Sequence, residues 1–306
     1  MARRIPALAL LASVLVLSGC VHESPFTGDS GYFFQAMGRD SEIVLTADTS
    51  RVKEEMPSML ATGSSVMGEL FDRSTRVSVA FYKDVYGGEE EYPADLADFD
   101  YYGGLEGNYG SFTINTALSW SSQFHKEKVD GVKYYTDDGH TIELAVPESG
   151  LLLFASRDYV EAYRRTVEER FVLIPDDTAR TIASSLFGIY VRSPRTMIDL
   201  GFDLPYAVIV KMSDAILYVN AGEDGGYVLN ADITMQSEDL ARTLLQLLRQ
   251  QVLAELRRQG VRPDYQALSQ QYLSEGRLVM IRDFPLSEEQ MNGLSSQITS
   301  ISGGII

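Results

Sequence analysis

The residues best suited to bind something lie between two expected β-strands. This segment runs from Asp84 to Gly104 and joins an alternating apolar stretch at 76–83 to another at 105–114. Hairpin loops are usually about 2–5 residues long, and much longer ones are often functional. Carboxylates attract cationic partners, and tyrosines offer rigid contact area with a polar tip. The candidate binding residues are Tyr86, Glu89, Glu90, Glu91, Tyr92, Asp95, Asp98, Asp100, Tyr101 and Tyr102.

Two other interpretations of this acidic segment stay open. A long acidic insertion can be solvated without binding any ligand. Asp95, Asp98 and Asp100 also offer the oxygen ligands that calcium prefers, but their spacing does not match a known calcium loop. We expect no metal and no cofactor. We also expect that removing residues 84–104 leaves the fold intact.

Candidate catalytic residues are few. His125 could act as an acid or base. Asp137, Asp138 and His140 fall together on an expected hairpin turn, where such residues are favoured for backbone reasons alone. The sequence contains no G-x-S-x-G elbow, phosphate-binding loop, dinucleotide fingerprint or HExxH motif. We assign no catalytic residue and expect a protein that is not an enzyme, with an unrecognised hydrolase as the weakest alternative.

The elements around these residues predict an α+β fold with mostly antiparallel sheets. β-Branched and apolar patterns predict strands at 42–47, 76–83, 105–114, 132–135, 141–146, 151–155, 187–191, 206–211, 215–221, 227–235 and 278–281. Apolar residues at helical spacing predict helices at 51–60, 116–128, 157–170, 237–259, 264–273 and 287–298. Trp120 lies on the second of these helices, and we expect it in the core. Hairpin turns between consecutive strands favour antiparallel pairing.

The order of elements indicates an internal duplication. The strands at 76–114 correspond to the hairpin at 215–235, and the helix at 116–128 corresponds to that at 237–259. The strand and helix at 151–170 correspond to those at 278–298, although few residues are identical. We therefore expect two α+β halves, residues 41–175 and 176–306.

The N-terminus has the features of an export signal. Arg3 and Arg4 form its positive region, and the apolar run Ile5–Leu17 is shorter than the ~20 residues of a membrane-spanning helix. The run ends in Leu17-Ser18-Gly19-Cys20, which resembles the lipobox of bacterial lipoproteins. The resemblance implies a signal peptide at 1–19, cleaved between Gly19 and Cys20. It also implies diacylglycerol on the sulfur of Cys20 and an acyl chain such as palmitate on the new amine.

The resemblance also bears on location. Val21 follows Cys20, and the sorting rule of the family then favours the outer membrane over the inner one. Residues 20–40 are rich in glycine, serine, proline and polar side chains, which predicts a flexible lipidated tether. The body should stand off the membrane and be held there by its lipid.

The composition narrows the classes of function. A formal net charge of −17 repels a phosphate backbone, so we expect no nucleic-acid partner. A single cysteine excludes a disulfide framework and an iron–sulfur cluster. We expect a membrane-anchored cell-envelope lipoprotein, non-enzymatic, whose soluble acidic body binds or scaffolds an unknown envelope protein or ligand. The alternative is a periplasmic carrier of lipid or another hydrophobic ligand.

Overall fold

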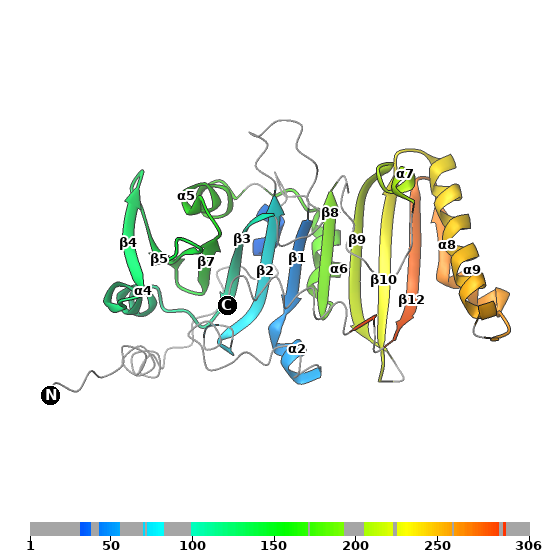
Figure 1. Ribbon diagram of the computed structural model, residues 1–306, viewed down its shortest axis with the longest axis horizontal. Coiled ribbons are helices and arrows are strands. Elements are labelled where there is room, and N and C mark those ends of the chain that lie inside the picture. The colour runs from blue at the N-terminus through cyan, green and yellow to red at the C-terminus, as the bar shows by residue number, and fades with distance from the viewer. Residues whose placement is uncertain are drawn as a thin grey trace.

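The computed structural model describes residues 31–37, 43–55, 70, 72–82, 99–170, 172–192, 205–222, 225–258, 260–287 and 290–291. These residues form a 12-stranded antiparallel sheet in the order β11-β12-β10-β9-β8-β1-β2-β3-β7-β6-β5-β4 (Figure 1). Its strands are β1 (Ile43–Asp48), β2 (Ser74–Tyr82), β3 (Asp100–Gly107), β4 (Phe124–Val129), β5 (Val132–Asp137), β6 (Glu143–Glu148), β7 (Leu151–Ala155), β8 (Phe187–Arg192), β9 (Met212–Ala221), β10 (Tyr227–Met235), β11 (Tyr272–Glu275) and β12 (Leu278–Leu286).

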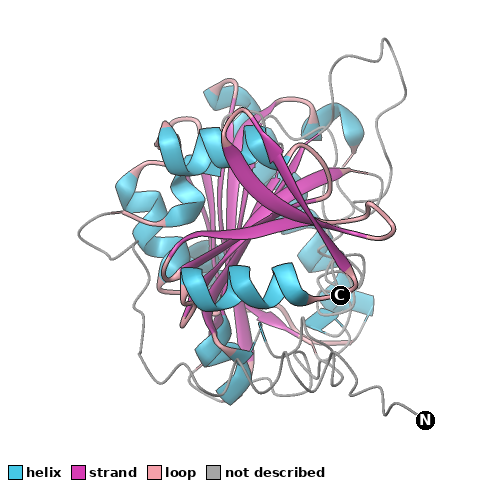
Figure 2. Cartoon of the chain, turned by 90° about the vertical axis from the view of Figure 1, so that its left-hand side faces the viewer, coloured by secondary structure: helices cyan, strands magenta, loops and turns pink. Residues whose placement is uncertain are grey.

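The helices lie around this twisted sheet, which Figure 2 shows from its β4 end. The described helices are the 3₁₀ turn η1 (Phe33–Met37), α2 (Thr49–Glu55), α4 (Ser111–Trp120), α5 (Tyr159–Tyr163), the π-helical turn η3 (Arg164–Glu168), α6 (Asp176–Ala183), α7 (Tyr206–Ile209), α8 (Glu238–Arg258) and α9 (Tyr265–Gln271). The prediction of a mixed fold with largely antiparallel strands is confirmed. Within the described residues, no helix is long and apolar enough to cross a bilayer.

The antiparallel pair β1–β8 stands at the middle of the sheet. Leu45 lies opposite Ile189 in this pair. From there, β1-β2-β3-β7 extend toward one end of the sheet and β8-β9-β10-β12 toward the other. Apolar side chains of both series, with Leu244 and Leu248 of α8, belong to one buried cluster. Residues far apart in the sequence are thus joined by a continuous ladder of backbone hydrogen bonds.

Four predicted elements differ from the structure. The strand expected at 105–114 lies earlier, as β3, and residues 111–114 belong to helix α4. The helix expected at 116–128 begins earlier, as α4, and ends at Trp120. Residues Phe124–Val129 form edge strand β4, because pairing with β5 overrides a helical spacing of apolar residues. Trp120 is 66% exposed, so its expected place in the core was wrong. The strand expected at 206–211 contains the short helix α7, and the helix expected at 157–170 begins at Tyr159 and continues into the π-helical turn.

The predicted tether was wrong over residues 33–37. All five residues of η1 are buried, and Phe33 and Phe34 belong to the main hydrophobic cluster. The side-chain amide of Gln35 donates to the carbonyl of Ile174 at 3.0 Å and accepts from the backbone N–H of Tyr32 at 2.7 Å. A buried amide satisfied in this way fixes the turn to the body. The export signal, Cys20 and the helix expected at 287–298, apart from residues 287 and 290–291, lie outside the described residues.

Candidate functional site

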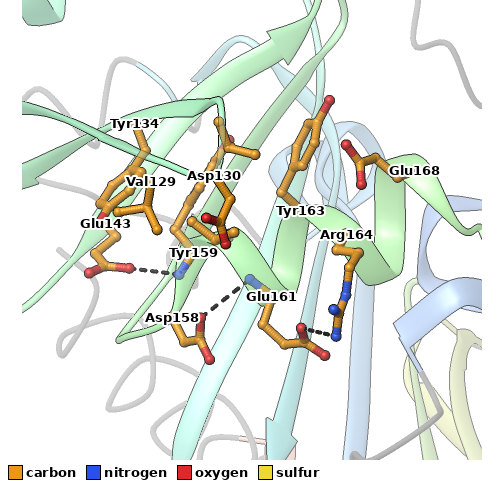
Figure 3. Close-up of a pocket in the computed structure, with 12 residues that line it drawn as sticks. Val129, Asp130, Tyr134, Glu143, Asp158, Tyr159, Glu161, Tyr163, Arg164 and Glu168 are labelled. Carbon is orange, nitrogen blue, oxygen red and sulfur yellow. Dashed lines mark hydrogen bonds and ion pairs between the residues drawn. The ribbon is translucent and has the colours of Figure 1, made fainter.

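A cavity of about 330 Å³ lies between the β4–β5 hairpin and the helical segment that follows β7 (Figure 3). Three separate stretches of the chain supply its walls. The β4–β5 hairpin contributes one wall, β6 contributes Glu143, and α5 with η3 contributes the wall opposite the hairpin. The lining residues are Val129, Asp130, Val132, Tyr134, Glu143, Asp158, Tyr159, Val160, Glu161, Tyr163, Arg164 and Glu168.

Two carboxylates fix the start of α5 beside the cavity. Asp158 has a φ of +58° and accepts a hydrogen bond from the backbone N–H of Glu161 at 3.3 Å. The backbone N–H of Tyr159 donates to Glu143 Oε2 at 2.7 Å. Both bonds satisfy amide groups that a helix N-terminus leaves without intrahelical partners. The helix therefore presents its first residues to the cavity in a fixed orientation.

Tyrosine rings form the apolar part of the cavity. Tyr134 and Tyr159 are stacked, with ring centroids 5.3 Å apart and ring planes 21° from parallel. Tyr159 is 1% exposed. Burial, with a smaller effect from Tyr163, raises the pKa of Tyr159, and burial followed by Glu143 raises that of Tyr134. Both phenols are therefore neutral at physiological pH.

The remaining lining groups make the cavity acidic. Five carboxylates surround it, from Asp130, Glu143, Asp158, Glu161 and Glu168, against the one guanidinium of Arg164. Glu161 pairs with both Arg164 and Arg165. Burial alone would raise the pKa of Glu161, but the hydrogen bonds from these arginines lower it. Because Glu161 neutralises Arg164, the other four carboxylates leave a surplus of negative charge.

The helix that walls the cavity changes its winding there. Residues Arg164–Glu168 form a π-helical turn, in which the backbone N–H of Glu169 donates to the carbonyl of Arg164 at 2.8 Å. Such turns are rare and frequently occur at functional sites. The turn carries Arg164 and Glu168, two of the charged lining residues.

The residues predicted as a binding loop divide into two groups. Asp100, Tyr101 and Tyr102 belong to β3, so the loop interpretation was wrong for them. Tyr102 is 2% exposed and donates to the carbonyl of Met37 at 2.9 Å, and Asp100 pairs with Arg157 at 2.6 Å. The other predicted residues lie outside the described residues: Tyr86, Glu89, Glu90, Glu91, Tyr92, Asp95 and Asp98.

The ends of β2 and β3 nevertheless lie close to the cavity. Tyr82 is the last residue of β2 and Asp100 the first of β3, so the acidic segment joins these two positions. Burial, then the charges of Asp100 and Asp158, raise the pKa of Tyr82 to about 12. Asp158 also lines the cavity. The cavity therefore lies near the two strand ends, Tyr82 and Asp100, that the acidic segment connects.

The histidines considered as acids or bases lie on the exposed hairpins. His125 Nε2 is 2.6 Å from Asp138 Oδ1, and both side chains are well exposed. His140 adopts a φ of +51° and lies 3.4 Å from Thr136 Oγ1. Asp137 accepts hydrogen bonds from Thr141 and Ile142 and so closes the turn. These contacts explain the residues structurally, and no group of three metal-ligating side chains occurs in the described part of the chain.

Comparisons with known proteins identify the fold only. No protein-family model and no curated protein matches the sequence. Crystal form I of a protein named TP0453 is similar to this chain, with a TM-score of 0.55 and 14% identity over 86% of this chain and 96% of that one. Crystal form IV gives a TM-score of 0.53 and 15% identity over 88% and 97%. The chain therefore shares the fold of TP0453.

Proposed function

We propose that this protein is a lipid-anchored lipoprotein of the bacterial cell envelope, non-enzymatic, whose acidic body binds an envelope partner. The observation that carries the binding role is the cavity of carboxylates and stacked tyrosines beside α5. The cavity lies near the last residue of β2 and the first residue of β3, the two positions that the acidic, tyrosine-rich segment connects. The lipobox Leu17-Ser18-Gly19-Cys20 supports the anchor, and Val21 supports the outer membrane as its location.

The body is proposed to descend from an internal duplication. The series β1-β2-β3-β7 and β8-β9-β10-β12 have the same internal order on either side of the central pair, which supports this origin. The first series carries an addition that the second lacks. That addition is the three-stranded β4-β5-β6 extension, which supplies much of the cavity.

The anchor is tested by metabolic labelling with palmitate in a bacterial host. The wild-type chain should incorporate label and fractionate with the outer membrane, whereas Cys20→Ala should incorporate none. Val21→Asp should move the labelled protein to the inner membrane. Equal labelling of wild type and Cys20→Ala would refute lipidation at this residue.

Partner binding is tested by crosslinking in cells and recovery of the full chain. The triple variant Glu89→Gln/Glu90→Gln/Glu91→Gln should recover much less partner. The control Glu54→Gln/Asp177→Asn/Glu275→Gln removes the same charge from exposed positions elsewhere and should recover as much as wild type. Deleting residues 84–104 cannot serve here, because it would remove residues 100–104, more than half of strand β3. Equal recovery from all three proteins would remove the role of the acidic segment.

Native mass spectrometry separates this proposal from a carrier of hydrophobic ligands. The purified protein should have the mass of the lipidated polypeptide alone. An additional mass that is lost on denaturation would favour the carrier.

A further inference from the structure

We infer that the cavity beside α5 binds an organic cation, an alkylammonium or alkylguanidinium group. Lysine and arginine side chains of a basic polypeptide carry such groups, and so do free polyamines. The inference rests on the proposed function and specifies the chemistry that the partner presents. Its evidence is the charge, the aromatic surface and the unpaired Tyr159 hydroxyl of the cavity.

The charge argument depends on which carboxylates are already used. The carboxylate of Glu161 forms ion pairs with Arg164 and Arg165. The side chains of Asp130 and Glu168 make no hydrogen bond or ion pair with any residue that the structure describes, and both residues are exposed at the rim. Asp130 comes from the hairpin and Glu168 from the π-helical turn, so the two approach the cavity from opposite walls (Figure 3). A cation between these walls would meet uncompensated negative charge from both sides.

The aromatic surface favours an organic cation over a bare metal ion. A cation within about 6 Å of a tyrosine ring is attracted by the negative face of the ring. Tyr134 and the half-buried Tyr163 provide such surface beside the carboxylates, and the buried Tyr159 stacks on Tyr134. An anion would be repelled here, and a wholly apolar ligand would bury carboxylates without partners, which is costly. The alkyl stem of a lysine or arginine side chain packs on rings while its head meets the charges.

The hydroxyl of Tyr159 is available to accept a hydrogen bond from a ligand. Tyr159 lines the cavity and is 1% exposed, yet its hydroxyl has no hydrogen-bond partner within the described chain. The hydroxyl is not among the fully enclosed polar atoms of the described chain that lack a partner, so it is open to a donor in the cavity. A phenol oxygen accepts hydrogen bonds from N–H donors, and ammonium and guanidinium groups are rich in these donors. The cavity volume of about 330 Å³ suits one such group, near the lower end of the ~300–1,000 Å³ range of ligand pockets.

Binding is tested on the full-length protein in detergent by calorimetry with agmatine, hexalysine and hexaglutamate. Agmatine and hexalysine should bind, and more weakly as salt is raised, while hexaglutamate should not. Asp130→Asn/Glu168→Gln should weaken binding about tenfold, since each exposed ion pair contributes up to ~1 kcal/mol. The control Glu54→Gln/Glu275→Gln has the same net charge, and its residues are exposed on α2 and on the edge strand opposite β4, so it should change binding less than about twofold.

Two further variants test the rings and the hydroxyl. Tyr159→Phe keeps the stacked ring and should weaken binding about fivefold, the value of one hydrogen bond. Tyr163→Leu should weaken it about threefold or more through loss of the ring face. Both should keep the wild-type unfolding midpoint to within a few degrees, which separates a contact with the cation from a structural role.

The outcomes distinguish a basic polypeptide from a free amine as the source of the cation. They also define which results would overturn the inference. Hexalysine binding much more tightly than agmatine would indicate a basic polypeptide, and equal affinities would indicate a free amine. No binding of either cation, or equal weakening by the rim pair and its control, would overturn the inference. If that happened while Glu89→Gln/Glu90→Gln/Glu91→Gln still lost its partner in cells, the proposed function would stand and only the cation site would fall.

Discussion

The side-chain amide of Gln35 donates a hydrogen bond to Asp176 Oδ1 over 2.9 Å, although 141 residues separate them in the sequence. The backbone carbonyl of Gln35 also accepts from the backbone N–H of Leu173 at 3.0 Å. One buried side chain therefore ties the beginning of the described chain to the connection that precedes α6. The contact makes η1 part of the body.

Replacing Gln35 with leucine should destabilise the protein by about 2–3 kcal/mol. The substitution nearly preserves volume but leaves the carbonyl of Ile174 and the N–H of Tyr32 without their partner. Urea unfolding followed by circular dichroism measures the change. Gln266→Leu, at an exposed position on α9, should stay within about 0.5 kcal/mol of wild type. Equal stability of Gln35→Leu and wild type would contradict the structural role of this amide.

Gly103→Ala should destabilise the protein by about 3 kcal/mol or more. A Cβ at Gly103 would lie 2.4 Å from Phe154 Cζ and 2.5 Å from the backbone oxygen of Ser78, and the backbone cannot move aside as a side chain can. Gly139→Ala is the control, because its Cβ would meet only side-chain atoms, the nearer at 3.2 Å. Thermal unfolding compares the two variants. A midpoint for Gly103→Ala as high as that of Gly139→Ala would show that β3 accommodates the methyl group.

The stability contributed by Asp137 should disappear in acid. Burial alone would raise the pKa of Asp137, but hydrogen bonds from Ile142, Thr141 and Gly139 lower it below its unfolded value of about 3.9. A lowered folded-state pKa stabilises the protein above the unfolded value, and this stabilisation is lost as pH falls through the folded one.

The wild-type advantage over Asp137→Asn should therefore be constant near pH 6 and shrink below about pH 4. Urea unfolding across this range measures it. An advantage over Asp137→Asn that grew toward low pH would reverse the assigned sign.

The single tryptophan provides a direct test of the end of α4. Trp120 is 66% exposed. Its fluorescence should resemble that of tryptophan in water, and acrylamide should quench it nearly as strongly as in the unfolded chain. Emission shifted strongly to the blue, with weak quenching, would mean that this residue is covered in solution.

Periodicity in the sequence predicts the buried strands of this protein better than it predicts the edge strand β4, the N-terminal turn η1 or the cavity. Leu151–Ala155 is continuously apolar and is buried as β7, as predicted. Residues 124–128 were wrongly predicted as helix, because Phe124 continued the helical spacing of Ala117 and Trp120, while pairing of β4 with β5 is a tertiary effect. Phe33 and Phe34 were missed because the polar composition around them dominated the interpretation, although two adjacent aromatics are a signal of burial.

The cavity could not be derived from spacing. Asp130, Glu143 and Tyr159 come from different segments that only the fold brings together. The hydrogen bond between Glu143 and the N–H of Tyr159 creates that proximity, and no local pattern encodes it. The acidic segment was identified by composition alone, which is why Asp100, Tyr101 and Tyr102 were assigned to it and not to β3.

The burial of η1 limits how far the body could travel from a membrane. If Cys20 carries the lipid, only 13 residue steps separate it from Phe33, the first residue of η1. A fully extended chain covers about 3.3–3.6 Å per residue, so the segment between Cys20 and Phe33 reaches roughly 45 Å. The flexible tether predicted from the sequence, which ended at residue 40, would have reached roughly 70 Å. The shorter reach would keep the body near its own bilayer and restrict it to partners in that membrane or just above it.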